Sequence, residues 1–237
     1  MNRMILTIVL GTLLLQGAIL VRSTSAWSAL AGNEAQLPSI DISEAPIKGN
    51  PQAPLVLVEF SDYECPFCGR YTNETEPQIE KTFVATGKLR YAFMNNPLPF
   101  HPSARLLASA AICAGKQNRY WEMHDHLFEK RPGARAELMA ALDGIPLDTA
   151  LFSACLDDSS QAPAVIDRDL TRAEALKLNG TPSFALGRVD SGNSLIVEKI
   201  IVGAQPYSVF EQTIHEELEN QRPRTIGGWI RFAVDRK

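Results

Sequence analysis

The sequence predicts an α/β fold in which an all-helical insertion separates two groups of strands. Residues 55–58 are continuously apolar, which is typical of a strand covered on both faces. Residues 65–87 have helical character and residues 88–93 alternate for most of their length, so a β–α–β unit is expected. Residues 103–178 show helical patterns without a convincing strand, and strands return at residue 183.

Smaller elements follow from turn-forming residues. A short edge strand is expected near residues 40–42, and Gly, Asn and Pro at residues 49–51 predict a turn. Pro77 interrupts the helical pattern of residues 65–87, so we expect a kink or a break there. Residues 95–102 contain three prolines and are expected to form a loop.

The insertion and the residues after it are expected to form helices first and a pair of strands afterwards. Asp, Ser, Gly and Asn at residues 190–193 predict a hairpin turn between these two strands. The expected helices are 104–114, 120–128, 134–142, 148–156, 163–178 and 207–219, and the expected strands are 183–186 and 195–202.

The composition is that of an ordinary globular protein. The chain has 237 residues, of which 45% are hydrophobic, and a formal net charge of −4. This length allows one large domain or two small ones. The acidic balance and the lack of a long basic stripe argue against a nucleic-acid partner.

The N-terminus has the pattern of an export signal. Arg3 precedes an apolar run over residues 4–21, and small residues follow up to Ala26. We therefore expect a signal peptide over residues 1–26, cleaved near Ala26. An uncleaved membrane anchor is the alternative, because the run is near the lower limit for spanning a bilayer. Both interpretations place the folded part outside the cytoplasm, in the periplasm or a similar compartment.

The expected organisation has a linker, a sheet domain in two parts around the insertion, and a basic C-terminal tail. The tail is interpreted as a solvated terminus, with weak contact to anionic lipid as the alternative. The segments are 1–26 for the signal peptide or anchor, 27–44 for the linker, 45–102 and 179–220 for the two parts of the domain, 103–178 for the insertion and 221–237 for the tail.

The most informative motif is Cys65-Pro66-Phe67-Cys68, just after the apolar strand. Two cysteines with this spacing are typical of a thiol–disulfide redox centre. The free N–H groups of a helix that begins here lower the pKa of the first thiol, so Cys65 is expected to attack and the buried Cys68 to resolve. Half of a zinc site and a structural bridge are the alternatives. No second ligand pair appears, however, and so short a bridge stabilises little.

The remaining cysteines, Cys113 and Cys155, lie in helical stretches of the insertion. An even number of cysteines in an exported chain favours pairing. A bridge between these two would close a loop of about 43 residues and contribute roughly 3–4 kcal/mol in the chain-entropy model. Two buried free thiols are the alternative.

Thr181 and Pro182 come just before a predicted strand. A proline that opens a strand can carry a cis peptide bond, and it interrupts the ladder of hydrogen bonds there. Such an edge can bind an extended peptide by strand addition. A trans proline in a turn is the commoner case.

Several segments together resemble DsbA-like thiol–disulfide oxidoreductases of the thioredoxin superfamily. They are residues 58–68, which end in the cysteine motif, the helical insertion, and residues 180–184, Gly-Thr-Pro-Ser-Phe. Residues 96–102 and 120–125 are similar to the family as well. The resemblance covers roughly residues 45–220. It implies a thioredoxin-like fold with helices on both faces of the sheet.

The resemblance also implies roles for residues around the motif. It makes Pro182 a cis-proline that faces Cys65, and it makes Thr181 the residue that meets the substrate backbone. Pro66 and Phe67, which lie between the cysteines, are expected to contact the substrate with them.

Glu59 lies six residues before Cys65, on the apolar strand. The resemblance implies that it lies under the disulfide and relays protons to the buried cysteine. A carboxyl group in an apolar strand has a raised pKa and can exchange protons with a thiol. A solvated Glu59 at an edge is the alternative.

We therefore expect an exported enzyme that forms disulfides in protein substrates, in which a substrate thiolate attacks the sulfur of Cys65. It is expected to need no metal or organic cofactor and to be a monomer. Its partners are exported proteins with cysteines and a membrane redox partner that resets the dithiol. Pro66 and Phe67 supply no cation to stabilise the thiolate, which predicts a moderate oxidant.

Other functions remain open at this point. A disulfide reductase or isomerase of the same fold is the first alternative, although the segment before the first core strand is too short for the separate dimerisation domain of such isomerases. A periplasmic chaperone with incidental cysteines is the second. A metallochaperone is the third, and it would need His101 as a further ligand.

The histidines carry weaker signals. His101, in the proline-rich loop, is a candidate neighbour of the active-site groove. His124 and His126 lie two residues apart and do not share a helix face, so they are interpreted as surface or packing residues. His215 is expected to be solvated.

Overall fold

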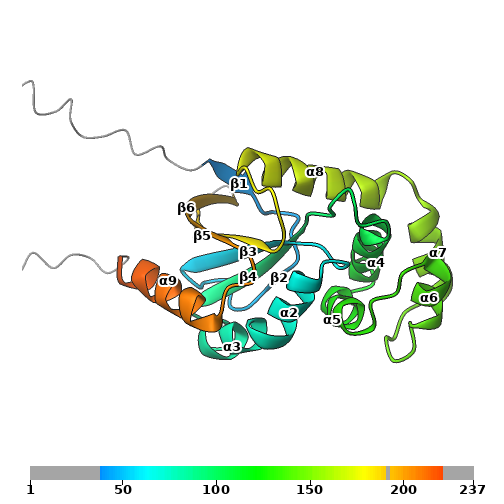
Figure 1. The fold of residues 1–237 in the computed structure, drawn as a ribbon, viewed down its shortest axis with the longest axis horizontal. Helices are drawn as coiled ribbons and strands as arrows, with labels where there is room; N and C mark the ends of the chain where they lie inside the picture. The colour runs from blue at the N-terminus through cyan, green and yellow to red at the C-terminus, as the bar shows by residue number, and fades with distance from the viewer. Residues whose placement is uncertain (1–37, 191–192, 221–237) are drawn as a thin grey trace, which may run out of the picture. The chain divides into compact units, whose positions relative to one another are not determined.

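The computed structural model describes residues 38–190 and 193–220. This part of the chain forms one mixed sheet with helices against it and a helical insertion after the fourth strand (Figure 1). The expected signal peptide, most of the linker, the centre of the hairpin turn and the basic tail lie outside the described residues. No helix in the described ranges is long and apolar enough to cross a membrane.

The six strands are β1 (Ser39–Asp41), β2 (Ile47–Lys48), β3 (Leu55–Ser61), β4 (Leu89–Asn95), β5 (Ser183–Val189) and β6 (Ser194–Val202). They lie side by side in the order β1-β6-β5-β3-β4-β2. Strand β3 runs parallel to β4 and antiparallel to β5, and the remaining pairs are antiparallel. The sequence did not predict β2, because two residues are too few to show a period.

The helices are α2 (Pro66–Glu74), α3 (Glu76–Ile79), the π-helical turn η1 (Glu80–Val84), α4 (Ala104–Gly115), α5 (Tyr120–Lys130), α6 (Arg135–Ala140), α7 (Thr149–Asp157), α8 (Gln161–Ala175) and α9 (Tyr207–Asn220). The break expected at Pro77 falls at Thr75, and Pro77 lies in the first turn of α3. A proline is tolerated there because the first N–H groups of a helix have no intrahelical partner. Helices α4 to α8 form the insertion between β4 and β5, which confirms the predicted fold class.

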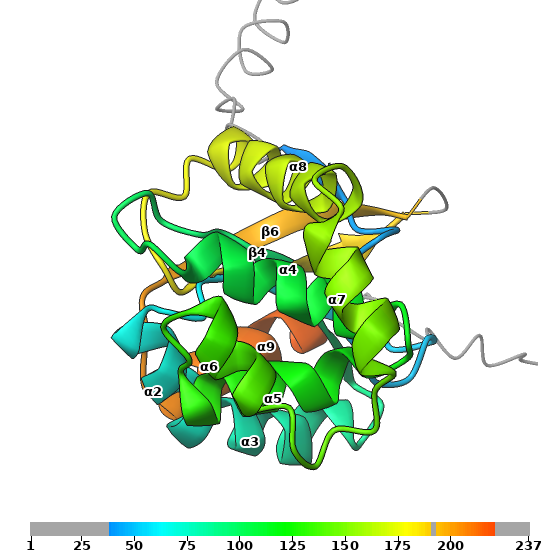
Figure 2. The same cartoon turned by 90° about the vertical axis from the view of Figure 1, so that its right-hand side faces the viewer.

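The central strand β3 is buried along its whole length, and its two faces pack against different helices. Val56 and Val58 share a core with residues of α8, whereas Leu55 and Leu57 share one with residues of α2, α3 and α9. Figures 1 and 2 show α8 on one side of the sheet and α2, α3 and α9 on the other. Successive side chains of a strand point to opposite faces, so Glu59 is on the side of α2.

A third core joins the insertion to the loop and helix that carry the cysteine motif. Tyr63, Cys65 and Cys68 pack in it with apolar side chains of α4 and α5, among them Leu107 and Met123. The motif therefore lies where the sheet, α2 and the insertion meet, and all three can shape its surroundings.

Candidate active site

The two cysteines of the motif lie where the chain passes from β3 into α2. Cys65 is the residue that caps α2, Pro66 is the first helical residue, and Cys68 lies in the first turn. Both are free thiols, and their exposed fractions are 4% and 0%. The chain thus places one sulfur at the open start of a helix and the other inside the protein.

The two thiols differ strongly in proton affinity. A hydrogen bond from the Cys68 thiol is the largest cause that lowers the pKa of Cys65, and polar groups of Thr181, Cys68 and Phe67 add to it against the opposing effect of burial. The resulting pKa of Cys65 is about 5. Burial raises the pKa of Cys68 far above its ordinary value, and Cys65 and Glu59 raise it further. At neutral pH the dithiol therefore consists of a Cys65 thiolate and a protonated Cys68.

The loop that faces Cys65 comes from the start of β5. The peptide bond between Thr181 and Pro182 is cis, and the sulfur of Cys65 lies 3.5 Å from the carbonyl oxygen of Thr181. The carbonyl oxygen of Pro182 accepts a hydrogen bond from the backbone N–H of Gly203 at 2.8 Å. The structure thereby brings together residues that are more than a hundred positions apart in the sequence.

Apolar side chains are exposed next to the motif and in a loop tied to it. The exposed fraction of Phe67 is 55%, and the guanidinium of Arg70 lies 5.4 Å from its ring centroid. Phe100 is 72% exposed, and its ring centroid lies 4.6 Å from that of His101. Both rings are therefore exposed apolar surface, one inside the motif and one in the proline-rich loop.

Two carboxylates that sequence reasoning missed fasten this second loop to the cysteine loop. Asp62 accepts a hydrogen bond from the backbone N–H of Leu98 at 2.7 Å, and its Oδ2 lies 2.8 Å from Nδ1 of His101. Glu64 accepts one from the backbone N–H of Ser103 at 2.7 Å. The two acidic residues just before the motif are the sequence feature that could have revealed this contact. Their partners are backbone N–H groups in or next to the proline-rich loop.

Glu59 is completely buried, so the alternative of a solvated edge residue is wrong. The hydroxyl of Tyr91 donates a hydrogen bond to Oε2 of Glu59, and Oε1 has no hydrogen-bond partner. Burial is the main cause that raises the pKa of Glu59 to about 8, and the charge of Glu76 adds to it. The hydrogen bond from Tyr91 and the nearby hydroxyl of Ser61 lower this pKa to a smaller extent. The carboxyl is thus protonated at neutral pH and electrostatically linked to Cys68.

The histidines of α5 and α9 have different surroundings. His124 is fully buried, which excludes the surface alternative and leaves a packing role among aromatic rings such as that of Phe93, at 4.8 Å between ring centroids. His215 is exposed. Within residues 38–190 and 193–220, no three His, Cys, Asp or Glu side chains are grouped so that they could hold a metal ion.

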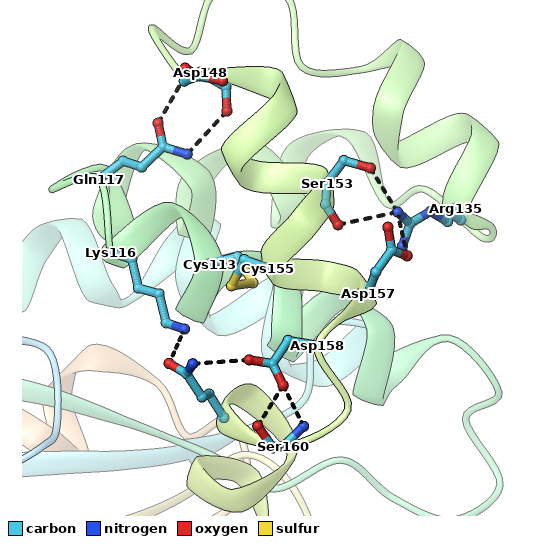
Figure 3. The surroundings of a disulfide bond; sticks show 11 residues. Cys113, Lys116, Gln117, Arg135, Asp148, Ser153, Cys155, Asp157, Asp158 and Ser160 are labelled. Atoms are coloured by element: carbon cyan, nitrogen blue, oxygen red, sulfur yellow. Dashed lines mark hydrogen bonds and ion pairs between the residues drawn. A yellow bond between two sulfur atoms is a disulfide. The ribbon is translucent and has the colours of Figure 1, made fainter.

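The other two cysteines are joined within the insertion. Cys113 of α4 and Cys155 of α7 form a disulfide with an S–S distance of 2.03 Å (Figure 3). Polar contacts surround it, including an ion pair between Arg135 and Asp157 at 3.0 Å. The bridge connects two helices that are 42 residues apart at the cysteines.

Comparison with known proteins agrees with this geometry. A family model described as "Thioredoxin" matches residues 43–200. Disulfide bond formation protein D of Bacillus subtilis is 26% identical over 201 residues, which cover 80% of this chain and 84% of that protein. Na(+)/H(+) antiporter NhaA 1 of Salinispora arenicola is 30% identical over 194 residues, which cover 79% of this chain. The chain spans only 28% of the length of that antiporter.

Solved structures give the same picture. The crystal structure of oxidised BdbD from Bacillus subtilis has a TM-score of 0.66 and 25% identity, with 79% of this chain and 100% of that chain covered. The crystal structure of Wolbachia pipientis α-DsbA1 has a TM-score of 0.65 and 19% identity, with 75% of this chain and 92% of that chain covered. At this identity the likeness shows the fold alone. The chain therefore belongs to the thioredoxin family, and it is similar to BdbD and to disulfide bond formation protein D over most of its length.

Proposed function

We propose that this protein is an exported oxidoreductase that forms disulfides in protein substrates through Cys65 and Cys68. The observation that carries the proposal is the large difference in pKa between the two thiols. Cys65 is a thiolate at neutral pH, whereas Cys68 is buried and protonated. A stable Cys65 thiolate is a good leaving group, which favours transfer of the disulfide to a substrate. The name of the Bacillus subtilis relative, Disulfide bond formation protein D, supports the same direction.

The reaction follows from this geometry. A substrate thiolate attacks the sulfur of Cys65 in the oxidised protein, the bond to Cys68 breaks, and the electron pair goes to Cys68. Cys68 takes a proton, for which Glu59 is the proposed donor. The second substrate thiolate then attacks the sulfur of the substrate in the mixed disulfide, and Cys65 leaves as a thiolate. The substrate loses two electrons and two protons, of which one ends on Cys68 and one in solvent.

The substrate is an exported polypeptide with free cysteines. Thr181 supports this assignment because its carbonyl lies beside the sulfur of Cys65, so an extended chain could bind along the loop that precedes β5. The exposed ring of Phe67 supplies an apolar contact beside the sulfur. We further propose that the protein acts as a monomer outside the cytoplasm. A membrane partner reoxidises it by the same exchange.

The reductive direction is the second candidate, and Phe67 is the observation that favours it. Its ring gives Cys65 no positive charge, whereas a cation between the cysteines would stabilise the thiolate further. A pKa of Cys65 of about 5 lies between roughly 7 for thioredoxin-type reductants and roughly 3.5 for the strongest oxidant of this kind. We therefore propose an oxidant of moderate strength.

The deciding experiment is the equilibrium potential of the Cys65–Cys68 pair in glutathione buffers, together with oxidation of a peptide dithiol. A potential above about −180 mV with catalytic peptide oxidation is expected for the proposed function. A potential near roughly −270 mV would identify a reductase instead. The Cys65→Ala variant separates the chaperone alternative, because a chaperone retains its activity without this sulfur.

A further inference from the structure

A buried charged cluster lies on the same side of the sheet as Glu59, and the function proposed above does not use it. Glu76, the first residue of α3, accepts a hydrogen bond from the ammonium of Lys48 of β2 at 2.8 Å. Its other oxygen lies 3.8 Å from Nε2 of His124 of α5. The side chains of Glu76 and His124 are 4% and 0% exposed, so a carboxylate of α3 is held inside the protein by residues of β2 and α5.

The cluster reaches toward the cysteine loop on one side and toward solvent on the other. Nδ1 of His124 lies 3.2 Å from the hydroxyl of Tyr63, two residues before Cys65. The ammonium of Lys48 lies 4.3 Å from the ring centroid of Trp121 and also pairs with Glu80 at the surface. It lies 5.1 Å from the ring centroid of Tyr91, whose hydroxyl donates a hydrogen bond to Glu59, so Lys48 and Tyr91 connect the two carboxyl groups. Lys48 is therefore held in place by charge and by ring contacts, and it fixes Glu76 in turn.

Several polar atoms in this region are buried without a hydrogen-bond partner, including the hydroxyls of Ser61 and Tyr71. Three of them are Oε1 of Glu59, Oε2 of Glu76 and Nε2 of His124, of which the last two form the 3.8 Å ion pair. Buried polar atoms are nearly always paired, and exceptions often mark a functional site. Three of the exceptions here belong to two carboxyl groups and an imidazole, which are groups that hold and transfer protons.

The surroundings push the two carboxyl groups toward opposite protonation states. Burial opposes a charge on Glu76, but the ion pair with His124 and the charge and hydrogen bond of Lys48 outweigh it and lower the pKa of Glu76. The negative charge of Glu76 is in turn the second cause, after burial, that raises the pKa of Glu59. One carboxyl is ionised and the other protonated, a division that enzymes use to separate acid from base.

We propose that Glu76, held between Lys48 and His124, is a positioning residue that keeps Glu59 protonated and ready to deliver a proton to Cys68. This inference rests on the proposed disulfide exchange. When the bond between Cys65 and Cys68 breaks, the electron pair on Cys68 takes the proton of Glu59, which becomes a carboxylate. A proton from solvent then restores it, so that atoms and charge balance over a turnover.

The titratable groups that face this pair come from every element packed around it. Glu59 is influenced by groups on β2, β4, α2 and α3, and Glu76 by groups on β2, β3 and α5. They are Lys48, Tyr63, Cys68, Tyr71, Glu80, Tyr91, Tyr120, His124 and Asp125.

The test is an infrared titration of the Glu59 carboxyl band between pH 4 and 10, assigned by its loss in Glu59→Gln. In the wild-type protein we expect the carboxyl to remain protonated at pH 7. Glu76→Gln removes a neighbouring negative charge while keeping the shape, and we expect it to lower the Glu59 midpoint by about one pH unit. The alkaline limb of the rate of reduction by dithiothreitol, where Glu59 loses its proton, should shift in the same direction.

Two control variants separate charge from structure. Glu76→Asp keeps the charge and should leave the Glu59 midpoint near that of the wild type. Glu80→Gln removes the surface partner of the same lysine and should change the midpoint by less than about 0.3 unit. A purely structural role for Glu76 predicts the reverse, a stability loss in both Glu76 variants and no shift of the midpoint.

The proposal is overturned if Glu76→Gln leaves the midpoint within about 0.3 unit of wild type, or if Glu59 is already ionised at pH 7 in the wild-type protein. The second measurement decides the matter even where Glu76→Gln fails to fold. The infrared band needs no substrate. A failure of the proposed function would appear separately, as a wild-type protein that does not oxidise peptide dithiols.

Discussion

The chain contains two pairs of cysteines with contrasting surroundings. Cys65 and Cys68 have two residues between them, lie at the start of a helix as free thiols, and are linked electrostatically to a buried carboxyl. Cys113 and Cys155 are 42 residues apart, are joined in a disulfide, and belong to two helices of the insertion. Both pairs border the same apolar core.

The contrast separates two physical effects of a sulfur–sulfur bond. A bridge that closes a long loop restricts the unfolded chain and so stabilises the fold, whereas one that closes four residues restricts it very little. Polar groups around Cys65 stabilise its thiolate, and a stable thiolate makes a disulfide easier to reduce. We infer that the Cys113–Cys155 bridge stabilises the fold because it closes a long loop. The Cys65–Cys68 pair is reactive because of its local electrostatics.

The largest expected effect comes from removing the attacking sulfur. Cys65→Ser should lower the rate of peptide-dithiol oxidation by at least roughly 1,000-fold, because a hydroxyl cannot form the mixed disulfide. The fold should persist, since the serine is nearly isosteric. Circular dichroism and the oxidation assay check both points. Residual activity within about tenfold of wild type would place the redox chemistry elsewhere.

Removing the other pair should give the opposite result. The double variant Cys113→Ala/Cys155→Ala should lower the free energy of unfolding by about 4 kcal/mol, the chain-entropy value for a loop of this length. Its oxidation rate should stay within about threefold of wild type under conditions where it remains folded. Urea unfolding and the peptide assay measure the two quantities. A large loss of rate in the folded variant would show that the bridge also shapes the active site.

Much of the fold was predictable because its elements have strong local patterns. The continuous apolar run at the start of β3, the alternation in β4 and the helical stretches of the insertion are each clear in the local sequence. Strand β2 has only two residues, and its place is set by pairing with Ala92 and Tyr91 of β4. The break before α3 depends on the context of Thr75, whose hydroxyl donates a hydrogen bond to the carbonyl oxygen of Gln205.

The candidate site was predictable where it depends on spacing along the chain. The two cysteines and Thr181 with Pro182 form recognisable motifs, whereas Glu76 and His124 are ordinary polar residues in helical stretches. Nothing in their local sequence says that α3 and α5 bring them together inside the protein. Pairing of buried polar groups is a property of the packed structure, and here it links residues 48 positions apart.

Substitution of Glu59 should have an intermediate effect. This carboxyl is linked to the reactive cysteines, and its raised pKa also makes the free energy of unfolding depend on pH. Its pKa is raised from 4.5 to about 8, so the folded protein holds a proton that the unfolded chain releases. This contribution to stability is complete below about pH 4.5 and is lost as the pH rises through about 8. Glu59→Gln should therefore gain stability relative to wild type as the pH rises from 4.5 to 8.5, by on the order of 4 kcal/mol.

Urea unfolding of the oxidised forms at these two pH values measures this difference, because no free thiol of the motif then titrates. The same variant should slow reduction of the Cys65–Cys68 disulfide by roughly tenfold if Glu59 supplies the proton to Cys68. Parallel stability curves for the two proteins would mean that Glu59 is ionised in the folded state, and they would remove it from the mechanism.

The smallest expected effect is a change in the redox potential of the Cys65–Cys68 pair that leaves both cysteines in place. Phe67→His places an imidazole between the cysteines, where its protonated form stabilises the Cys65 thiolate. We expect a pKa of Cys65 below that of wild type and a potential more positive by about 30 mV, a tenfold change in the exchange equilibrium.

Phe67→Leu keeps an apolar side chain and should leave both values near those of wild type. Because Phe67 is exposed and distant in sequence from the Cys113–Cys155 bridge, stability should hardly change in either variant. If both substitutions shifted the potential equally, loss of the aromatic ring would be the cause, and charge beside Cys65 would not govern its reactivity.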